Sequence, residues 1–516
     1  MLVSMLGLWS CHKDLDRFPT NDLTAEVVYK NIAGYQGVAA KAYGAFALTG
    51  SFGPGSTDLA GIDAGTSDFL RLWWKAQTLS TDEAVVAWND PGIQDFHNMN
   101  WSSTNPMLNG LYNRCLYQIS VVNEFLREST PAKLSGRGIT GNDATVVNLF
   151  RAELRFLRAF QYWVLMDLYG NPPFITEESV VGLASPPQIK RAELFTYIEN
   201  ELKAIEPELV NARANQYGRV DKAAAWALLS RLYLNANVYT GTPRFTDAIA
   251  NSKKVIDAGY ILLPNYALMF LADNNVANTE MILPIIYDGL KTQNFGGTTF
   301  LVHAQIQEGM TASQFGVNGG WSGIRATRAL PDAFPDNSGA TDRRAIFFRG
   351  NPIEISAVSA AATGWPSTKF KNVTRAGIAG SDPSGDFVDT DFPLFRFAEM
   401  HLNYAEAVLR GGTGGSTALA LTYINALRQR AYRNTDGDFT SLSLDELLKE
   451  RMREMHWEGL RRTDLIRYGH FTSGSFVWPW KGGIAGGTGV AAFRNLYPIP
   501  ASDLSSNANL QQNPNY

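Results

Sequence analysis

The sequence has few of the side chains that build disulfide scaffolds and metal centres. Its 516 residues include only two cysteines, Cys11 and Cys115, which excludes a disulfide-stapled fold and a cysteine-rich zinc or iron–sulfur site. The six histidines are scattered, and no two have the H-E-x-x-H spacing that places two imidazoles on one helical face. We therefore expect no metal hydrolase, and we assign no metal ligands and no cofactor.

Charge of either sign is also scarce. The 45 basic and 49 acidic residues leave a net charge of -4, and charged residues make up 18% of the chain, below the roughly 25% of an average soluble domain. Because there is no surplus of positive charge, we do not expect the protein to bind nucleic acid. No uncharged apolar run after the amino terminus is long enough to span a bilayer.

The amino terminus has the outline of a bacterial lipoprotein signal. Residues 1–10 (MLVSMLGLWS) form a short apolar run that ends immediately before Cys11, with Leu8 three positions before that cysteine. In such signals a peptidase cuts before the cysteine, which carries the lipid, so the mature chain is anchored and does not span the membrane. Two features depart from the pattern: no Lys or Arg precedes the run, and Trp9 is bulky for its place. An apolar terminus with a chance cysteine is the alternative, whereas Cys115 is expected to be a buried thiol.

Helical periodicity dominates both ends of the mature chain, while the middle is rich in Gly, Pro, Asn and Thr. Amphipathic patterns predict helices over 147–169, 221–239, 397–410, 417–432 and 444–468. Paired helices with small residues at their seams resemble tetratricopeptide-like hairpins, although the strict repeat consensus is absent. We predict a mainly α fold, in which helical hairpins form a scaffold and a large irregular, loop-rich region carries the ligand site.

The last predicted helix carries a row of like charges. Glu450, Glu454 and Glu458 follow one another at i+4 steps, where they would repel unless arginines neutralise them. Five arginines are close enough in sequence to do so: Arg451, Arg453, Arg461, Arg462 and Arg467.

The usual motifs of enzyme chemistry are missing. The sequence has no G-x-S-x-G elbow and no G-x-x-x-x-G-K-[ST] loop, and the glycine runs at 411–415 and 482–489 follow no predicted strand. A glycosidase needs only two carboxylates at the right separation, so an enzyme stays open as an alternative. Six acidic residues could supply that pair: Asp82, Glu83, Glu399, Glu406, Glu454 and Glu458. Since acidic residues on regular helical rows are usually ion-paired or solvated, we expect a protein that is not an enzyme.

Several segments together resemble the SusD/RagB family. They are TDEAVVAWNDPGIQDFHNMNW (81–101), RAELRFLRAFQYWVLMDLYGNPPFI (151–175), FPLFRFAEMHLNYAEAVL (392–409), ERMREMHWEGLRRTDLIRYG (450–469) and YPIP (497–500). The resemblance runs over nearly the whole length, from the segment just after Cys11 to the carboxyl end. Ala508 and Asn515 depart from the family pattern at two turn positions.

The resemblance implies both a location and a role. Members of this family are surface lipoproteins of the outer membrane of Gram-negative bacteria, which capture glycans and deliver them to a SusC-like TonB-dependent transporter. It also implies one domain over 11–516, with a helical part at about 11–260, a loop-rich insert at 261–395 and a carboxyl-terminal part at 396–516. The expected partners are therefore a glycan, the transporter and, through lipid on Cys11, the outer membrane.

A glycan site needs a flat aromatic side chain for the C–H face of a sugar ring and polar groups for its hydroxyls. We expect the strongest platforms to be Trp88, beside Asn89 and Asp90, and Trp321, in a loop of small residues. Trp73 and Trp74 are adjacent, so in an extended stretch only one of them could face a ligand. The other candidates are Trp101, Trp365, Arg325, Asp58 and Asp63.

Two alternatives to glycan capture follow from the same residues. One is a surface glycoside hydrolase that uses two of the carboxylates above. The other is a peptide- or protein-binding lid of a transporter, in which the helical-repeat surface makes the contact and the tryptophan loops do not.

Overall fold

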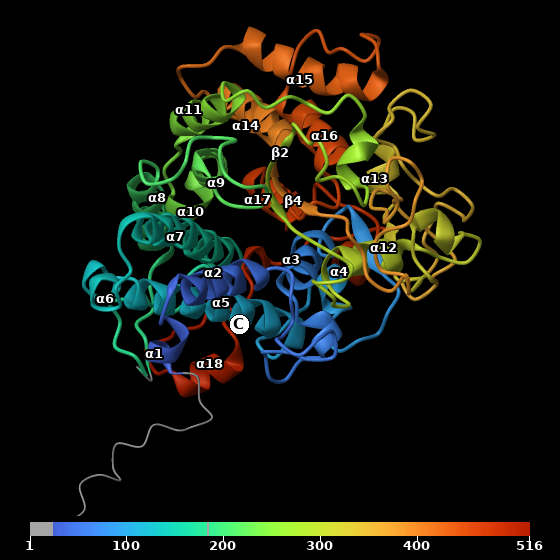
Figure 1. Ribbon diagram of the computed structural model, residues 1–516. Helices are drawn as coiled ribbons and strands as arrows, with labels where there is room; N and C mark the ends of the chain where they lie inside the picture. The colour runs from blue at the N-terminus through green and yellow to red at the C-terminus, as the bar shows by residue number, and fades with distance from the viewer. Residues whose placement is uncertain (1–23, 183–184) are drawn as a thin grey trace, which may run out of the picture.

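The computed structural model of the protein describes residues 24–182 and 185–516. Cys11 and the expected signal at 1–10 lie outside these residues. In the described part, no helix combines the length and the apolar character needed to cross a bilayer. The prediction of a mainly α fold is confirmed (Figure 1).

The amino-terminal half is a stack of helices. Its elements are α1 (Ala25–Val28), α2 (Ile32–Gly44), η2 (Ala64–Thr66), α3 (Phe69–Thr78), β1 (Ala84–Val86), α4 (Asp95–Asn98), α5 (Pro106–Glu128), α6 (Pro131–Gly136), α7 (Gly141–Tyr169), α8 (Arg191–Ile205), α9 (Lys222–Leu234), α10 (Ala236–Thr240) and α11 (Phe245–Ile256). Helix α7 packs between α5 and α8, and α2 lies across both α5 and α7. The Asp221 carboxylate starts α9 by accepting from the backbone N–H groups of Ala223 and Ala224.

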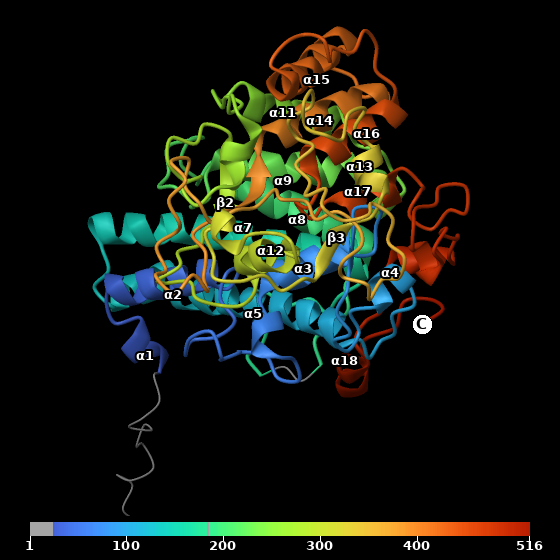
Figure 2. The ribbon, with the colours of Figure 1, turned by 90° about the vertical axis from the view of Figure 1, so that its right-hand side faces the viewer.

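The middle of the chain contains only short elements. They are η3 (Tyr266–Phe270), β2 (Met281–Ile285), α12 (Gly297–Gln305), η4 (Ala312–Phe315), β3 (Ile324–Ala326) and α13 (Ala329–Asp332). Figure 2 turns this loop-rich side toward the viewer, with α12, β2 and β3 in front of the helices.

The carboxyl-terminal part extends the helical stack and then returns to its centre. Its elements are β4 (Phe392–Arg396), α14 (Phe397–Leu409), α15 (Thr417–Tyr432), α16 (Leu444–Met455), α17 (Arg461–Arg467), η5 (Lys481–Gly483), η6 (Ala492–Asn495) and α18 (Ala501–Ser506). Helix α14 packs against α11, α15 and α16. The segment predicted as one helix over 444–468 is two helices, because Trp457 and Gly459 adopt positive φ angles of 63° and 73° between them.

Two antiparallel pairs of short strands join the middle to the helices. β1 pairs with β3 in the register Ala84↔Ala326 and Val86↔Ile324. β2 pairs with β4, so the middle segment is held to the strand that leads directly into α14.

Helix α3 lies at the centre of the molecule and is covered by the end of the chain. The Trp74 indole N–H donates to the Trp457 carbonyl at 2.9 Å. The Tyr497 hydroxyl donates to the Ala76 carbonyl at 2.7 Å, across 421 residues of sequence. The first and last parts of the chain therefore share one core.

The glutamate row that begins on α16 lies in a buried ion network. Glu450 contacts Arg344, Arg428 and Arg453. Glu454 contacts Arg344, Arg396 and Arg430, and Glu458 contacts Lys369 and Arg396. The predicted neutralisation by basic residues is present, although most of the partners come from distant segments.

Candidate functional site

The structure brings Trp88 and Trp321 together from opposite parts of the chain. Their ring centroids lie 6.4 Å apart, with the ring planes inclined by 45°. The Trp88 indole N–H donates to the Trp321 carbonyl at 3.1 Å. Both side chains are half-buried, so each leaves part of its ring open to solvent.

The short β1–β3 ladder explains this pairing. The strands run antiparallel, and the Ala87 N–H continues the ladder by donating to the Gly323 carbonyl at 2.9 Å. The residues that follow β1 therefore lie beside those that precede β3. A Cβ at Gly323 would come within 2.5 Å of the Trp88 ring, so only glycine lets that indole lie against the neighbouring backbone.

His303 of α12 supports the pair from behind. The His303 ring stacks on Trp321, with centroids 4.6 Å apart and planes inclined by 15°. Carbonyls of Gly319 and Asp386 lie 2.7 and 3.0 Å from the His303 ring nitrogens. Burial lowers the pKa of His303, which favours a neutral ring behind the indole.

Phe295 completes the exposed aromatic surface. Its ring lies 6.5 Å from that of Trp321 and is backed by Phe387 at 5.4 Å. The Phe295 residue is 38% exposed. We call Trp88, Trp321 and Phe295 the aromatic cluster. The sequence interpretation missed Phe295, although its place between Asn294 and two glycines was the same small-residue loop context that singled out Trp321.

Arg71 supplies a polar group at the edge of the aromatic cluster. Its guanidinium lies over the rings of Phe300 and Trp88, at 4.5 and 5.6 Å from their centroids. Its Nη1 donates to the carbonyls of Gly65 and Phe295, whereas Nε and Nη2 have no hydrogen-bond partner among residues 24–182 and 185–516. Burial lowers the pKa of Arg71 to about 10, so the side chain stays a cation at neutral pH.

Exposed polar residues lie on the same side of the aromatic cluster as Arg71. The charges of Asp68, Asp90 and Asp63 raise the pKa of the Arg71 guanidinium against the effect of burial, and Asp68 contributes most of the three. The carboxylates of Asp90 and Asp63 and the neighbouring Asn89 amide are exposed. The cluster thus has aromatic faces, a free guanidinium N–H group and acceptor oxygens, which together can bind C–H surface and hydroxyls.

The prediction of a sugar-binding platform is wrong for three of the tryptophans. Trp73 and Trp74 are 0% exposed and Trp101 is 1% exposed, so none of them offers a ring face to a ligand. Trp73 and Trp74 belong to α3, which is buried along its whole length, and the extended geometry assumed for them does not occur. Trp101 packs on Tyr497, and its indole N–H donates to the Tyr516 hydroxyl.

Arg325 is also a structural residue. Its guanidinium is buried and donates to the carbonyls of Thr363, Val358 and Gly323. It therefore holds the loop that carries residues 358–363 against β3, and it does not reach the aromatic cluster.

Two further candidates lie away from the cluster. Trp365 is half-buried beyond β3, bridged to Ala326, and its indole N–H donates to the Asn351 carbonyl at 2.8 Å. Asp58 is exposed and forms a long ion pair with Arg114 at 3.8 Å. Neither contacts Trp88, Trp321 or Phe295 among the aromatic and polar contacts of the described residues.

The six carboxylates considered for hydrolysis are all buried. Five are ion-paired: Asp82 with Arg461, Glu399 with Arg231, Glu406 with Arg467, and Glu454 and Glu458 within the buried ion network. Burial raises the pKa of the sixth, Glu83, to about 8. Within the described ranges, no three His, Cys, Asp or Glu side chains are grouped as metal ligands.

Comparison with known proteins gives three consistent results. The profile of the SusD family matches residues 339–516. The chain is 37% identical to the starch-binding protein SusD of Bacteroides thetaiotaomicron, and the alignment covers 99% of this chain and 96% of that protein. Among solved structures, a laminarin-binding SusD-like protein has a TM-score of 0.69 at 23% identity, covering 95% of this chain and all of the other.

A second solved structure has the same fold. The surface glycan-binding protein A from Bacteroides thetaiotaomicron, in complex with laminarihexaose, has a TM-score of 0.70 at 19% identity and covers 93% of this chain and 99% of that chain. At these identities the two structures establish the likeness of the fold.

Proposed function

This chain belongs to the SusD family, and from that premise we propose that it is a non-catalytic, cell-surface glycan-binding protein. It captures an oligosaccharide or polysaccharide and delivers it to a SusC-like TonB-dependent transporter. Lipid on Cys11 anchors it in the outer membrane of a Gram-negative bacterium.

The observation that carries this proposal is the Trp88–Trp321 pair. Two half-exposed indoles, joined by an indole–carbonyl hydrogen bond and backed by a stacked histidine, form a rigid apolar platform. Binding a sugar on a rigid platform costs little side-chain entropy. The free Arg71 N–H group and the exposed carboxylates of Asp63 and Asp90 lie beside the platform to bind hydroxyls.

We propose an α-glucan of the starch type as the ligand. The support is the starch-binding relative, which is 37% identical over nearly the full length of both chains. The geometry of the pair agrees with this ligand. Two ring planes inclined by 45° can both lie against one sugar chain if that chain curves, and α-linked glucans curve.

Affinity electrophoresis in gels that contain starch or laminarin tests the proposal. We expect starch to retard the wild-type protein, and we expect Trp88→Ala and Trp321→Ala to weaken that retardation about tenfold or more, because each removes a stacking surface. Trp365→Ala is the matched control, since it removes a half-buried loop tryptophan outside the aromatic cluster. Absence of retardation by every glycan, with folded protein, would refute glycan capture.

The same variants separate the two alternatives. A lid that binds through its helical surface predicts that Trp88→Ala and Trp321→Ala leave ligand binding unchanged. A hydrolase predicts the release of reducing sugar during prolonged incubation. We expect no release, because the six carboxylates considered above are buried and five of them are held by cations.

A further inference from the structure

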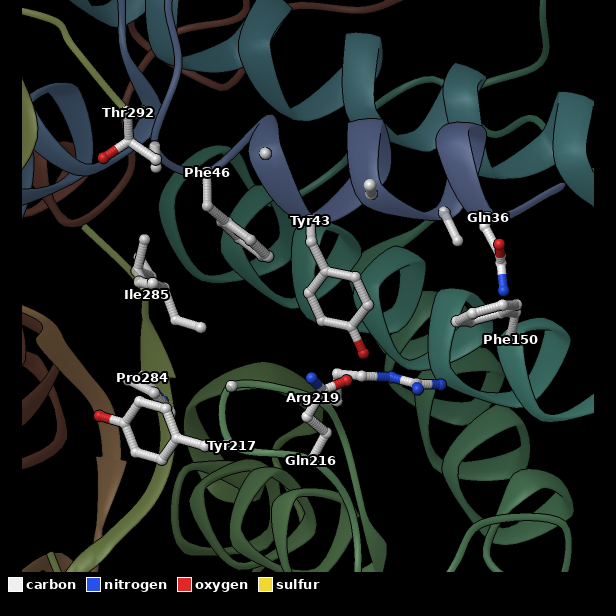
Figure 3. Close-up of a pocket in the computed structure, with 16 residues that line it drawn as sticks. Gln36, Tyr43, Phe46, Phe150, Gln216, Tyr217, Arg219, Pro284, Ile285 and Thr292 are labelled. Atoms are coloured by element: carbon white, nitrogen blue, oxygen red, sulfur yellow. The ribbon is translucent and has the colours of Figure 1, made fainter. Parts of the chain in front are cut away.

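A cavity of about 520 Å³ opens on the face of α2 that looks toward β2 (Figure 3). Helix α2 forms one wall, the loop 216–219 forms the opposite wall, and residues 284–286 at the end of β2 close one side. None of the contacts that form the aromatic cluster involves these residues. This volume lies within the range of about 300–1,000 Å³ that is typical of small-molecule sites.

The walls of the cavity are largely aromatic and aliphatic. Tyr43, Phe46, Phe150 and Tyr217 contribute rings. The Tyr43 hydroxyl is already used, because it donates to Glu153 Oε2 at 2.6 Å and accepts from the Val220 N–H at 3.0 Å. The Tyr217 hydroxyl is also used, because it donates to Asp391 Oδ2 at 2.8 Å, so the rings present C–H and π surface to the cavity.

The cavity carries no unbalanced charge. Arg219 is the only ionisable cation among the lining residues, and Glu153 binds it through two of its nitrogens. The guanidinium also lies 4.5 Å from the centroid of the Phe150 ring. A phosphate or carboxylate ligand would meet a cation that is already neutralised, so we expect a neutral ligand.

Two amide side chains at the mouth have no partner. Gln36 on α2 and Gln216 on the opposite loop are both exposed, and neither amide makes a hydrogen bond to any residue within 24–182 or 185–516. Figure 3 shows the two side chains on opposite walls. Each amide offers donors and an acceptor, which suits the hydroxyls of a sugar.

One segment of the chain connects this cavity to the aromatic cluster. Ile285, Ile286 and Thr292 line the cavity, and Phe295 of the cluster follows three residues after Thr292. The Asn294 amide fixes the connection by donating to the carbonyl of Ala47, another lining residue. A glycan that leaves the cluster past Phe295 would follow this segment toward the cavity.

We propose that the cavity is a second carbohydrate-binding site, which holds a sugar residue of the same glycan chain that lies on the aromatic cluster. The apolar walls receive the C–H face of the ring, and Gln36 and Gln216 bind its hydroxyls. This inference rests on the proposed function. It adds that long chains bind more tightly than short ones, because one chain engages both sites.

The test fills the cavity without touching the cluster. Ala40 is an exposed α2 residue that lines the cavity, so Ala40→Trp should occlude it, and Gln216→Ala removes one amide. Ala33→Trp is the matched control, because Ala33 is also exposed on α2 and lies two helical turns away, about 10 Å along the axis. Circular dichroism melts verify that each variant is folded.

Isothermal titration calorimetry with amylopectin, maltoheptaose and maltotriose gives the readout. We expect Ala40→Trp and Gln216→Ala to weaken amylopectin binding about tenfold, with maltotriose binding and the Ala33→Trp control unchanged. In a Trp88→Ala/Trp321→Ala background, we expect weak maltoheptaose binding that Ala40→Trp removes.

Two results would overturn the inference, and they are distinguishable. If Ala40→Trp and Gln216→Ala bind amylopectin like the wild type while Trp88→Ala does not, the cavity is not a glycan site and the proposed function stands. If the wild type binds none of the three glucans, the starch-type ligand and the second site fail together.

Discussion

Replacing Glu450 by glutamine should destabilise the protein severely. The Glu450 side chain is fully buried, and its oxygens lie 2.6, 2.7 and 2.9 Å from nitrogens of Arg344, Arg428 and Arg453. Burial alone would raise the pKa of this carboxyl, but the three guanidinium groups reverse the effect and lower it to about 2. Glutamine keeps the shape of the side chain and removes its negative charge. The three buried arginines then have less negative charge beside them.

Two estimates give the expected loss in the free energy of unfolding. Removing one partner of a buried ion pair costs about 3–5 kcal/mol. A pKa lowered from 4.5 to about 2 corresponds by linkage to about 3 kcal/mol of stability at neutral pH. Because the folded pKa is depressed, this contribution is complete above the unfolded pKa of 4.5 and is lost as the pH falls toward about 2.

Urea denaturation at neutral pH measures the effect on the free energy of unfolding. Glu446→Gln is the matched control on the same helix, one turn earlier, where the ion pair with Lys449 is exposed and should contribute less than about 1 kcal/mol. The wild type should approach Glu450→Gln in stability as the pH is lowered below about 5. A Glu450→Gln variant within about 0.5 kcal/mol of the wild type at neutral pH would refute this account of the network.

Three further predictions concern the binding site, a buried acid and the membrane anchor. Phe295→Ala should weaken starch binding several-fold in affinity gels with only a small loss of melting temperature, because the residue is 38% exposed. Burial raises the pKa of Asp68 to about 6, so its contribution to stability, about 3 kcal/mol, is present below the unfolded pKa and is lost as the pH rises through about 6. Melting curves at pH values on either side of 5 should show this slope, and Asp68→Asn should flatten it. Cys11→Ser should abolish incorporation of labelled palmitate and release the protein from membranes; unchanged labelling would show that the lipid is elsewhere.

The helical scaffold could be predicted from periodicity because amphipathic rows depend on local spacing. The pattern over 397–410 corresponds to α14 at Phe397–Leu409. The partners of the glutamate row could not be predicted in the same way. Arg453 was among the expected partners of this row, but Arg344, Arg396 and Arg430 reach it from elsewhere in the sequence. The break after α16 arises because Trp457 packs against Trp74, a contact across 383 residues.

The site was predictable where a residue's own loop context carried the signal. Trp88 and Trp321 were selected singly, because they are large aromatic residues among small and polar neighbours. Their pairing depends on two strands of only three residues each, which are too short to show a period. Trp73 and Trp74 were misjudged because composition does not distinguish a buried helix from an exposed loop. Arg71 was missed because its position is set by a contact that the local sequence does not show. The Phe295 carbonyl, 224 residues away, accepts from Nη1 of Arg71.

The burial of α3 beneath the end of the chain has a consequence for biosynthesis. Ala76 meets Tyr497, 421 residues later, and at roughly 5–20 residues per second a ribosome needs about 20 to 80 s to make the intervening chain. Until then the segment that covers Ala76 of α3 is missing, so the core around this helix is incomplete. Under the proposed function the chain is exported before it acts, and a core that is completed late leaves it easier to thread through a translocation pore. It also means that a ribosome that stops a few dozen residues early releases a polypeptide in which α3 lacks part of its cover, which makes it a better substrate for proteases.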